Sequence, residues 1–365
     1  MLKKISMLSL ILILAGCDYF DEYDKYNKIN QESYKIVSID DDFDANSKSD
    51  AQYYYTYNTK GFTTKIEYDY QLNGVTNLIY NYSYSEDKLS KASVDYNADG
   101  KDDLVYNYKY LDNRLQKVEY DYNNDSKVDY TYSYNYNTKG LVASYKVEVS
   151  QKGITIISDF KDDNFNKSKY FCDFGLCLDF IKFPNNSPET LVKIPHTTTA
   201  TTSTYSKPFE KGDIEYKYSY NDSGLTKSIS IDYNIDGTVD TVYNYYYNDK
   251  NLVSKIGYDY DANSVEDYLI IYNYNSDNLV SKLAVDYYND STIDIEYIYE
   301  YNSKKLLNKL SVNYASSNKI DTVYSYNYND KNLLISIDED YNNDSKIDRS
   351  IKYNYMLFKE GAVKL

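Results

Sequence analysis

The sequence is short of the residues on which most enzyme active sites depend. It has one histidine, three cysteines and no tryptophan among 365 residues. The single histidine, His196, lies in a Thr-rich stretch, so no Ser-His-Asp set can be assembled. No GxSxG, HExxH, P-loop or GxGxxG motif occurs in a strand-turn-helix context. Carboxylates are so frequent that an apparent acid pair carries no information, and we predict that the chain is not an enzyme.

Apolar residues gather in a short run at the start of the chain, where Leu8 to Leu14 follow Lys3 and Lys4. The run is too short to span a bilayer and has the layout of an export signal. It leads into Leu14-Ala15-Gly16-Cys17, which resembles the lipobox of bacterial lipoproteins. That resemblance implies cleavage before Cys17, acylation of Cys17 and a mature chain outside the cytoplasm. The alternative is an ordinary signal peptide with an incidental cysteine.

Several acyl chains on one residue give a stable membrane anchor. The resemblance therefore implies a lipid-anchored protein of the bacterial cell envelope, with the membrane as a partner. Asp18 resembles an inner-membrane retention signal that not all bacteria use, so the membrane and leaflet stay open. Cleavage removes two lysines and changes the net charge from −16 to −16 − 2 = −18. This charge argues against nucleic acid as a partner and suits cation binding.

The other two cysteines, Cys172 and Cys177, are separated by a short segment that contains Gly175. In an exported protein this spacing predicts a small disulfide loop. The alternative is two free thiols. A metal site formed by these two cysteines is disfavoured, because His196 is the only histidine that could join them.

Tyrosine is abundant, with 51 residues, and it occurs in a repeating pattern. The motif Tyr-x-Tyr-Asn, a short polar turn, Leu and an acidic loop recurs along almost the whole chain. The acidic loops begin at Asp42, Asp69, Asp95, Asp121, Glu148, Asp232, Asp259, Asp286, Asn313 and Asp340. Successive starts are 27, 26, 26, 27, 84 and then four times 27 residues apart. The long step equals one repeat plus 84 − 27 = 57 residues.

This spacing predicts how the chain is divided. Residues 1–16 form the lipoprotein signal peptide and 17–33 the anchor and linker. Hairpin repeats occupy 34–158, and further repeats with a C-terminal cap occupy 213–365. Residues 159–212 form a loop-rich insertion, which holds all four prolines, the histidine and both remaining cysteines.

Within one repeat the side chains alternate with a period of two. Tyr243, Tyr245 and Tyr247 alternate with other residues, as in a β-strand. The connections 137–140 and 221–224 carry residues that accept positive φ, as hairpin turns require. We predict an all-β fold of tandem antiparallel hairpins, about 27 residues each. Because wide sheets twist, the meander of about twenty strands is expected to curve or spiral.

The Tyr- and Asp-rich meander from Tyr34 to about Tyr355 resembles the YD/RHS-type repeats of bacterial surface and toxin-shell proteins. Those repeats are shorter and usually rich in glycine and arginine, whereas this chain has 12 glycines. No recognisable toxin or protease segment follows the array, so toxin delivery is not implied.

Six acidic loops carry oxygen-bearing side chains at positions 1, 3, 5 and 9 and predict structural Ca2+ sites, because calcium takes six to eight oxygen ligands. The predicted ligand sets are Asp42, Asp44, Asn46 and Asp50; Asp95, Asn97, Asp99 and Asp103; Asp121, Asn123, Asp125 and Asp129; Asp232, Asn234, Asp236 and Asp240; Asp259, Asp261, Asn263 and Asp267; and Asp340, Asn342, Asp344 and Asp348. The alternative is a set of solvated turns, since Asp, Asn, Gly and Ser are common in hairpin loops.

These loops resemble the calcium loops between strands of integrin-type propeller repeats. That resemblance implies ligation at positions 1, 3, 5 and 9 and by the carbonyl at 7. It also implies an apolar side chain that points inward near the end of the loop, for which Val128, Val239, Val265 and Ile347 are the candidates. Other loops, such as the one at Asn313, have lost ligands, so a cation would stabilise the array without being needed in every repeat.

The composition leaves three functions open. The first is an envelope-anchored binding, adhesion or scaffold module whose ligand is a glycan or a protein. The second is a purely structural spacer. The third is a polysaccharide-acting enzyme with its site near the 159–212 insertion. The tyrosines are expected to form cross-strand ladders that replace an aliphatic core, with hydroxyls that can stay wet at the rim.

Overall fold

A computed structural model describes residues 34–150, 213–314 and 319–358 of the chain. Cys17, the Cys172–Cys177 pair and the 159–212 insertion lie outside the described residues, so the expectations for them stay predictions. In the described part of the chain there is no helix with the length and hydrophobicity needed to cross a membrane.

The described residues form twenty β-strands. They are β1 (Tyr34–Asp42), β2 (Ala51–Tyr57), β3 (Thr63–Asp69), β4 (Leu78–Ser85), β5 (Lys88–Asp95), β6 (Leu104–Leu111), β7 (Arg114–Asp121), β8 (Tyr130–Tyr136), β9 (Val142–Val149), β10 (Ile214–Tyr220), β11 (Thr226–Asp232), β12 (Thr241–Tyr247), β13 (Val253–Asp259), β14 (Tyr268–Tyr274), β15 (Val280–Asp286), β16 (Ile295–Tyr301), β17 (Leu307–Tyr314), β18 (Thr322–Tyr328), β19 (Leu334–Asp340) and β20 (Arg349–Leu357).

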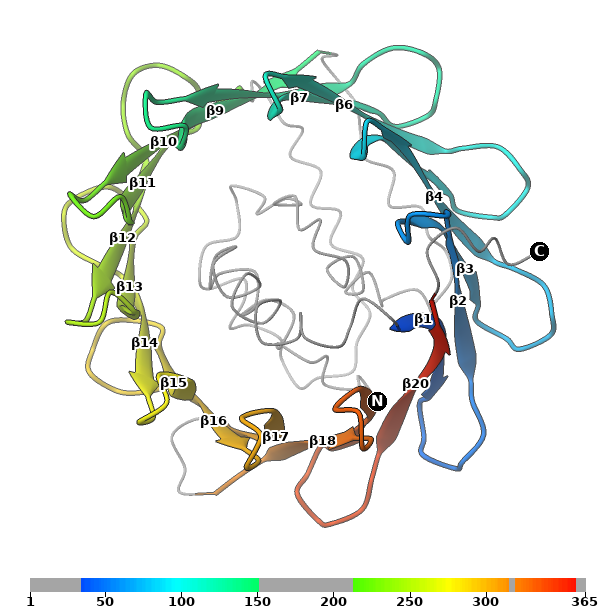
Figure 1. Ribbon diagram of the computed structural model, residues 1–365. Coiled ribbons are helices and arrows are strands. Elements are labelled where there is room, and N and C mark those ends of the chain that lie inside the picture. Colours follow the sequence, from blue (N-terminus) through cyan, green and yellow to red (C-terminus); the bar gives the residue numbers. More distant parts are fainter. Residues whose placement is uncertain (1–33, 151–212, 315–318, 359–365) are drawn as a thin grey trace, which may run out of the picture. The chain divides into compact units, whose positions relative to one another are not determined.

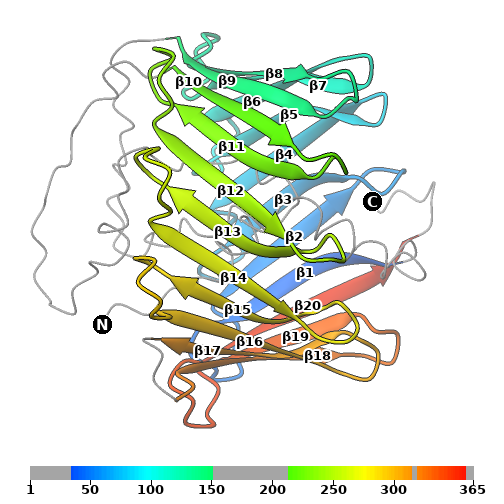
Figure 2. The same cartoon turned by 90° about the vertical axis from the view of Figure 1, so that its left-hand side faces the viewer.

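Each strand pairs antiparallel with its neighbours in sequence, and β20 also pairs with β1, so the sheet closes on itself (Figure 1). Strands β9 and β10 pair directly although Val149 and Asp213 are 64 positions apart in the sequence. Figure 2 shows neighbouring strands running side by side at a common tilt. The prediction of an all-β, curved hairpin meander is confirmed. The curvature brings the last strand, β20, back to the first, β1.

The strands have two faces of different chemistry. In β2 and β3, Tyr53 lies opposite Tyr68 and Tyr55 opposite Ile66, and all four are buried. Between them, Tyr54 lies opposite Glu67 on the other side of the sheet. We call the first side the aromatic face; its buried members include Tyr53, Tyr55, Ile66, Tyr68, Val94, Tyr106, Tyr108, Val118, Tyr120, Ile256, Tyr258, Ile270, Leu283, Tyr297, Leu310 and Tyr324.

The rings on the aromatic face contact one another across strands. The ring centroids of Tyr53 and Tyr68 are 4.6 Å apart and nearly perpendicular, and those of Tyr258 and Tyr268 are 4.9 Å apart. Each such pair stabilises the sheet by roughly 0.2–1 kcal/mol. Tyrosine therefore supplies the buried surface that an aliphatic core supplies elsewhere.

The connections alternate between two rims of the sheet, because the strands are antiparallel. The acidic rim comprises the loops 43–50, 70–77, 96–103, 122–129, 233–240, 260–267, 287–294, 319–321 and 341–348. The turn rim comprises the turns 58–62, 86–87, 112–113, 137–141, 221–225, 248–252, 275–279, 302–306 and 329–333.

Most turns of the turn rim are closed by an asparagine. In the turn 58–62, the side-chain oxygen of Asn58 accepts hydrogen bonds from the backbone N–H groups of Lys60 and Phe62, and Gly61 has a φ of 83°. The same asparagine contacts recur in the turns that begin at Asn137, Asn221, Asn248, Asn275, Asn302 and Asn329. Asparagine is favoured here because its short side chain mimics a backbone turn.

Tyrosine hydroxyls connect each repeat to the one before it. Nine tyrosines near the turn-rim ends of their strands donate a hydroxyl to a backbone carbonyl of the preceding repeat, usually 21 residues earlier, as Tyr301 does to Val280 at 2.8 Å. The same bond is made by Tyr57, Tyr84, Tyr136, Tyr220, Tyr247, Tyr274, Tyr328 and Tyr355, with 78 residues in place of 21 for Tyr220 because the insertion intervenes. These hydroxyls therefore connect repeats, a structural role that was not part of the expectation from sequence.

The seam between β20 and β1 is built differently from the other strand pairs. Arg349 donates two hydrogen bonds to the carboxylate of Asp41, at 2.9 and 2.7 Å, and its third nitrogen lies 3.5 Å from Glu339. Asp41, Glu339 and Arg349 are 1%, 4% and 8% exposed. Tyr341 donates its hydroxyl to Glu339. We call Asp41, Glu339 and Arg349 the seam triad.

Candidate cation loops at the acidic rim

The first and ninth residues of each acidic loop fold the loop through backbone hydrogen bonds. In the first loop, the carboxylate of Asp42 accepts the N–H groups of Asn46 and Ser47, at 3.0 and 2.7 Å. Asp50, at position 9, accepts the N–H of Phe43 at 2.7 Å. One carboxylate thus holds the middle of the loop and the other holds its start. This explains in physical terms why aspartate recurs at these two positions.

The same bonds recur in the other five complete loops. The carboxylates at position 1 are those of Asp95, Asp121, Asp232, Asp259 and Asp340. The carboxylates at position 9 are those of Asp103, Asp129, Asp240, Asp267 and Asp348, each 2.7–2.8 Å from the N–H of position 2.

Loops that lack the full ligand set keep this geometry. Asp69 accepts the N–H of Gly74 at 2.9 Å, and Asn77 accepts that of Tyr70 at 2.8 Å. Asp321 accepts the N–H of Tyr314 at 2.8 Å. The shape of the loop therefore follows from backbone capping, and a complete set of oxygen ligands is not needed to form it.

Positions 4 and 6 of the loops have positive φ. In the fourth loop these are Asn124 at 51° and Ser126 at 69°. Serine also takes positive φ at positions 47, 264, 291 and 345, where glycine would do so with less strain.

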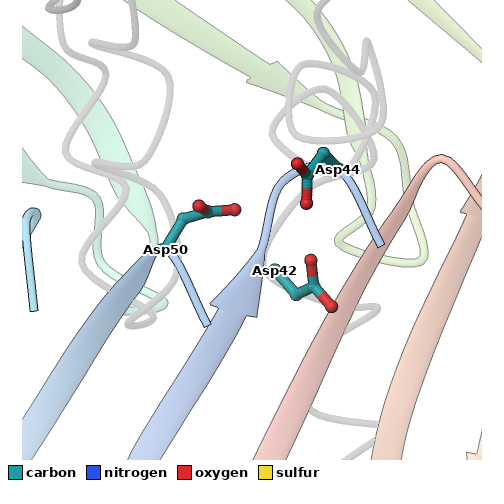
Figure 3. Close-up of side chains that lie close together, drawn as sticks. All are labelled: Asp42, Asp44 and Asp50. Atoms are coloured by element: carbon teal, nitrogen blue, oxygen red, sulfur yellow. The ribbon is translucent and has the colours of Figure 1, made fainter. Parts of the chain in front are cut away.

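Two loops bring three carboxylates together. One is formed by Asp42, Asp44 and Asp50, and the other by Asp259, Asp261 and Asp267; in each, one oxygen from every residue lies within 4.8 Å of the others. Figure 3 shows Asp42 at the end of β1, Asp44 in the loop and Asp50 just before β2. Oxygens at this separation can share one calcium ion, which binds its ligands at about 2.3–2.6 Å.

The other four complete loops differ at positions 3 and 5. They have asparagine at position 3 and aspartate at position 5, whereas the two converging loops have the reverse. Within the described residues, the carboxylates at position 5 are in no cluster of three acidic groups. They accept the N–H of position 7 instead, as Asp99 does from Lys101 and Asp125 from Lys127, both at 2.9 Å. Among the described residues, these four loops therefore bring no three carboxylates together.

Two loop carboxylates have lowered pKa values. Burial alone would raise the pKa of Asp232, but backbone N–H groups, Gly237 foremost, more than compensate. The pKa of Asp125 is lowered by the backbone N–H and the ammonium of Lys127. The backbone N–H groups thus favour the ionised form of both carboxylates, and at Asp125 the ammonium of Lys127 adds to this effect.

Three of the four apolar residues near the ends of the loops do not point inward, whereas Val128 is half-buried. Val239, Val265 and Ile347 are 37%, 61% and 44% exposed. The expectation drawn from the integrin-type resemblance is wrong for these three residues, because the inward positions are already filled by the aromatic face. The backbone caps at positions 1 and 9 are what the pattern encodes.

Sequence reasoning missed the seam triad and the inter-repeat tyrosine bonds. A signal for each was present. Arg349 is one of only two arginines, and Asp41 and Glu339 occupy a repeat position that elsewhere holds residues such as Val94 and Tyr120. A tyrosine also stands at the same place near the turn-rim end of the first strand in every hairpin.

The sequence matches no protein-family model and no curated protein. Among solved structures, the chain is similar to the complex TcdB2-TccC3-Cdc42, at 12% identity and a TM-score of 0.41, over 79% of this chain and 13% of that one. It is also similar to porin-like proteins from Bacteroides uniformis ATCC 8492 and Bacteroides vulgatus ATCC 8482. The identities are 10% and 8% and the TM-scores 0.34 and 0.28, over 88% of this chain and 98% of each of those. The chain thus spans a small part of the first and nearly all of the others.

Proposed function

We propose that the chain is an envelope-anchored, non-enzymatic binding and scaffold module, held to the membrane by an acylated Cys17. The observation that carries this proposal is the closed sheet. Every described strand is paired on both sides, so the sheet offers no open edge for growth or aggregation. The repeats keep their register and vary in their rim residues, which is how repeat proteins display binding surfaces.

The anchor is tested by metabolic labelling with an alkyne-tagged fatty acid. We expect label on the wild-type protein and none on Cys17→Ala, which should leave the membrane fraction. Pull-down from envelope extract with the membrane-anchored chain then tests binding. Specific capture of a protein or glycan supports a binding module, whereas a labelled protein that captures nothing is a spacer.

We further propose that calcium stabilises the two loops with three converging carboxylates. A cation there would neutralise three charges that otherwise repel one another by about 1 kcal/mol per pair in a water-like dielectric. The proposal does not extend to the other four complete loops. A rise in the melting temperature with millimolar calcium, reversed by chelator, is the expected result.

A matched pair of variants tests the assignment. Asp44→Asn with Asp261→Asn removes one charge from each converging loop and keeps an oxygen that accepts the N–H of Asn46 or Asn263. The control, Asp99→Asn with Asp236→Asn, makes the same charge change in two other loops. We expect the calcium-dependent shift to vanish in the first variant and persist in the control. Equal shifts in both, or none in the wild type, contradict the proposal.

A further inference from the structure

Two neighbouring hairpins depart from the repeat. The 26-residue steps in the sequence correspond to the hairpins β4–β5 and β6–β7, each of which is one residue shorter in all than a hairpin of the 27-residue repeat. Glu86 and Asp87 form one turn and Asp112 and Asn113 the other, and all four have positive φ, as a two-residue type I′ turn requires. Other hairpins on this rim have the longer turns that begin with asparagine.

A hollow lies between the tips of these two hairpins. It has a volume of about 440 Å3, within the range of about 300–1,000 Å3 that is usual for small-molecule sites. We call it the turn pocket; its lining includes Glu86, Lys88, Tyr108, Tyr110, Asp112 and Asn113. It thus combines aromatic rings with carboxylate, amide and ammonium groups in a small space.

Tyr110 is the exception among the tyrosines that connect repeats. Its nine counterparts each donate a hydroxyl to the carbonyl of the preceding repeat, and the matching acceptor here would be Leu89. Within the described residues, the hydroxyl of Tyr110 makes no hydrogen bond, and the residue is 36% exposed. Lys88 lies over its ring at 5.5 Å from the centroid and donates to Asn113 at 2.6 Å. The hydroxyl that elsewhere seals the sheet is therefore available at the pocket, which is also lined by the Tyr110 ring and by Lys88, whose ammonium lies over that ring.

We propose that the turn pocket binds a neutral saccharide, an inference that rests on the proposed binding function and specifies its ligand. The Tyr110 ring offers an amphipathic surface for the C–H face of a sugar, and its hydroxyl both donates and accepts. Glu86 and Asp112 accept hydrogen bonds from sugar hydroxyls, while Asn113 can donate and accept. Acidic glycans are disfavoured because the chain carries a net charge of −16.

The test uses the full membrane-anchored chain, purified in detergent, on a microarray of neutral and acidic oligosaccharides. We expect binding to neutral members and at least a tenfold loss of signal for Tyr110→Ala. The matched control is Tyr301→Ala, the same repeat position in a distant hairpin. Asp112→Asn, in an exposed turn that favours asparagine, provides a second pocket variant if Tyr110→Ala does not fold.

The outcomes separate the pocket from the general function. Loss of signal in both folded pocket variants, with signal kept in Tyr301→Ala, supports the proposal. Unchanged binding by both pocket variants overturns it and leaves a binding module with another site. An empty array combined with capture of an envelope protein in the pull-down rejects the saccharide alone. An empty array and an empty pull-down reject the binding function as well.

Discussion

The seam between β20 and β1 and the junctions between internal repeats solve the same problem with different chemistry. At internal junctions, the residue before the acidic loop and the residue after it are mostly apolar, as with Val94 and Leu104 or Val285 and Ile295. At the seam, Asp41, Glu339 and Arg349 occupy those positions. The difference separates what makes a strand pair stable from what makes it specific.

Apolar junctions are interchangeable, since any hairpin edge with the same alternation can pair with any other. Without the seam, β1 and β20 would be two such edges, and they would be as free to pair with another copy as with each other. A buried ion pair adds little net stability over an apolar pair, but it strongly disfavours a partner that lacks the opposite charge. The seam triad therefore selects which two strands meet.

The largest expected effect comes from Arg349→Ala. The substitution leaves Asp41 and Glu339 buried without a cation, which costs roughly 3–5 kcal/mol in the free energy of unfolding. Equilibrium denaturation monitored by circular dichroism measures it. A loss below about 1 kcal/mol is typical of an exposed ion pair and would contradict a buried seam triad.

A triple variant separates charge from packing at the seam. Asp41→Val, Glu339→Val and Arg349→Ile installs residues found at the same positions of internal repeats. We expect stability at or above the wild type, because apolar replacements of buried ion pairs are often neutral or stabilising. We also expect more dimers in light scattering. A monomer as pure as the wild type would show that the charges do not select the partner.

A medium effect is expected at the tyrosines that connect repeats. Tyr301→Phe removes the hydrogen bond to Val280 and should lower the free energy of unfolding by about 0.5–1.5 kcal/mol. Tyr110→Phe removes a hydroxyl without such a bond and should change it by less than about 0.5 kcal/mol. Similar losses in the two variants would refute the exceptional status of Tyr110.

Sequence alone gave the local features of this fold and not the non-local ones. Alternation in segments such as Tyr243–Tyr247 defines strands, and the Asn-led and acidic connections define which rim each loop occupies, because these signals act within a few residues. The pairing of Tyr34–Asp42 with Arg349–Leu357 depends on total twist and curvature summed over all twenty strands. No short stretch of sequence encodes that sum.

The candidate sites were predictable to a similar extent. The spacing of the acidic repeats located the acidic loops that the structure describes, but it did not distinguish Asp44 and Asp261, which converge with their neighbours, from Asp99 and Asp125, which do not. That depends on side-chain direction at positions 3 and 5. The turn pocket was marked only by a repeat one residue shorter, and its volume arises from two hairpins packed side by side.

The smallest expected effect is a pH dependence specific to the seam. Burial raises the pKa of Glu339 above its ordinary value of 4.5, and Arg349 only partly opposes this. Between 4.5 and the raised value, the unfolded chain is ionised while the folded chain keeps the proton, so stability falls as pH rises. Glu339→Gln should remove this slope and gain stability relative to the wild type as pH rises through that window. Parallel pH profiles of the two proteins would contradict the assignment.

Closure of the sheet at the seam is tested most directly by cross-linking its two strands. Ser38 of β1 and Asn354 of β20 are register partners, and Asn354 donates to Ser38 at 3.0 Å. Directly opposed residues of antiparallel strands have Cα atoms roughly 4.5–5.5 Å apart, which a disulfide can bridge. In Ser38→Cys with Asn354→Cys, we predict an intrachain disulfide, seen by mass spectrometry as a linked peptide pair from a monomer. Cross-links found only between chains, or none under oxidising conditions, would contradict a closed sheet.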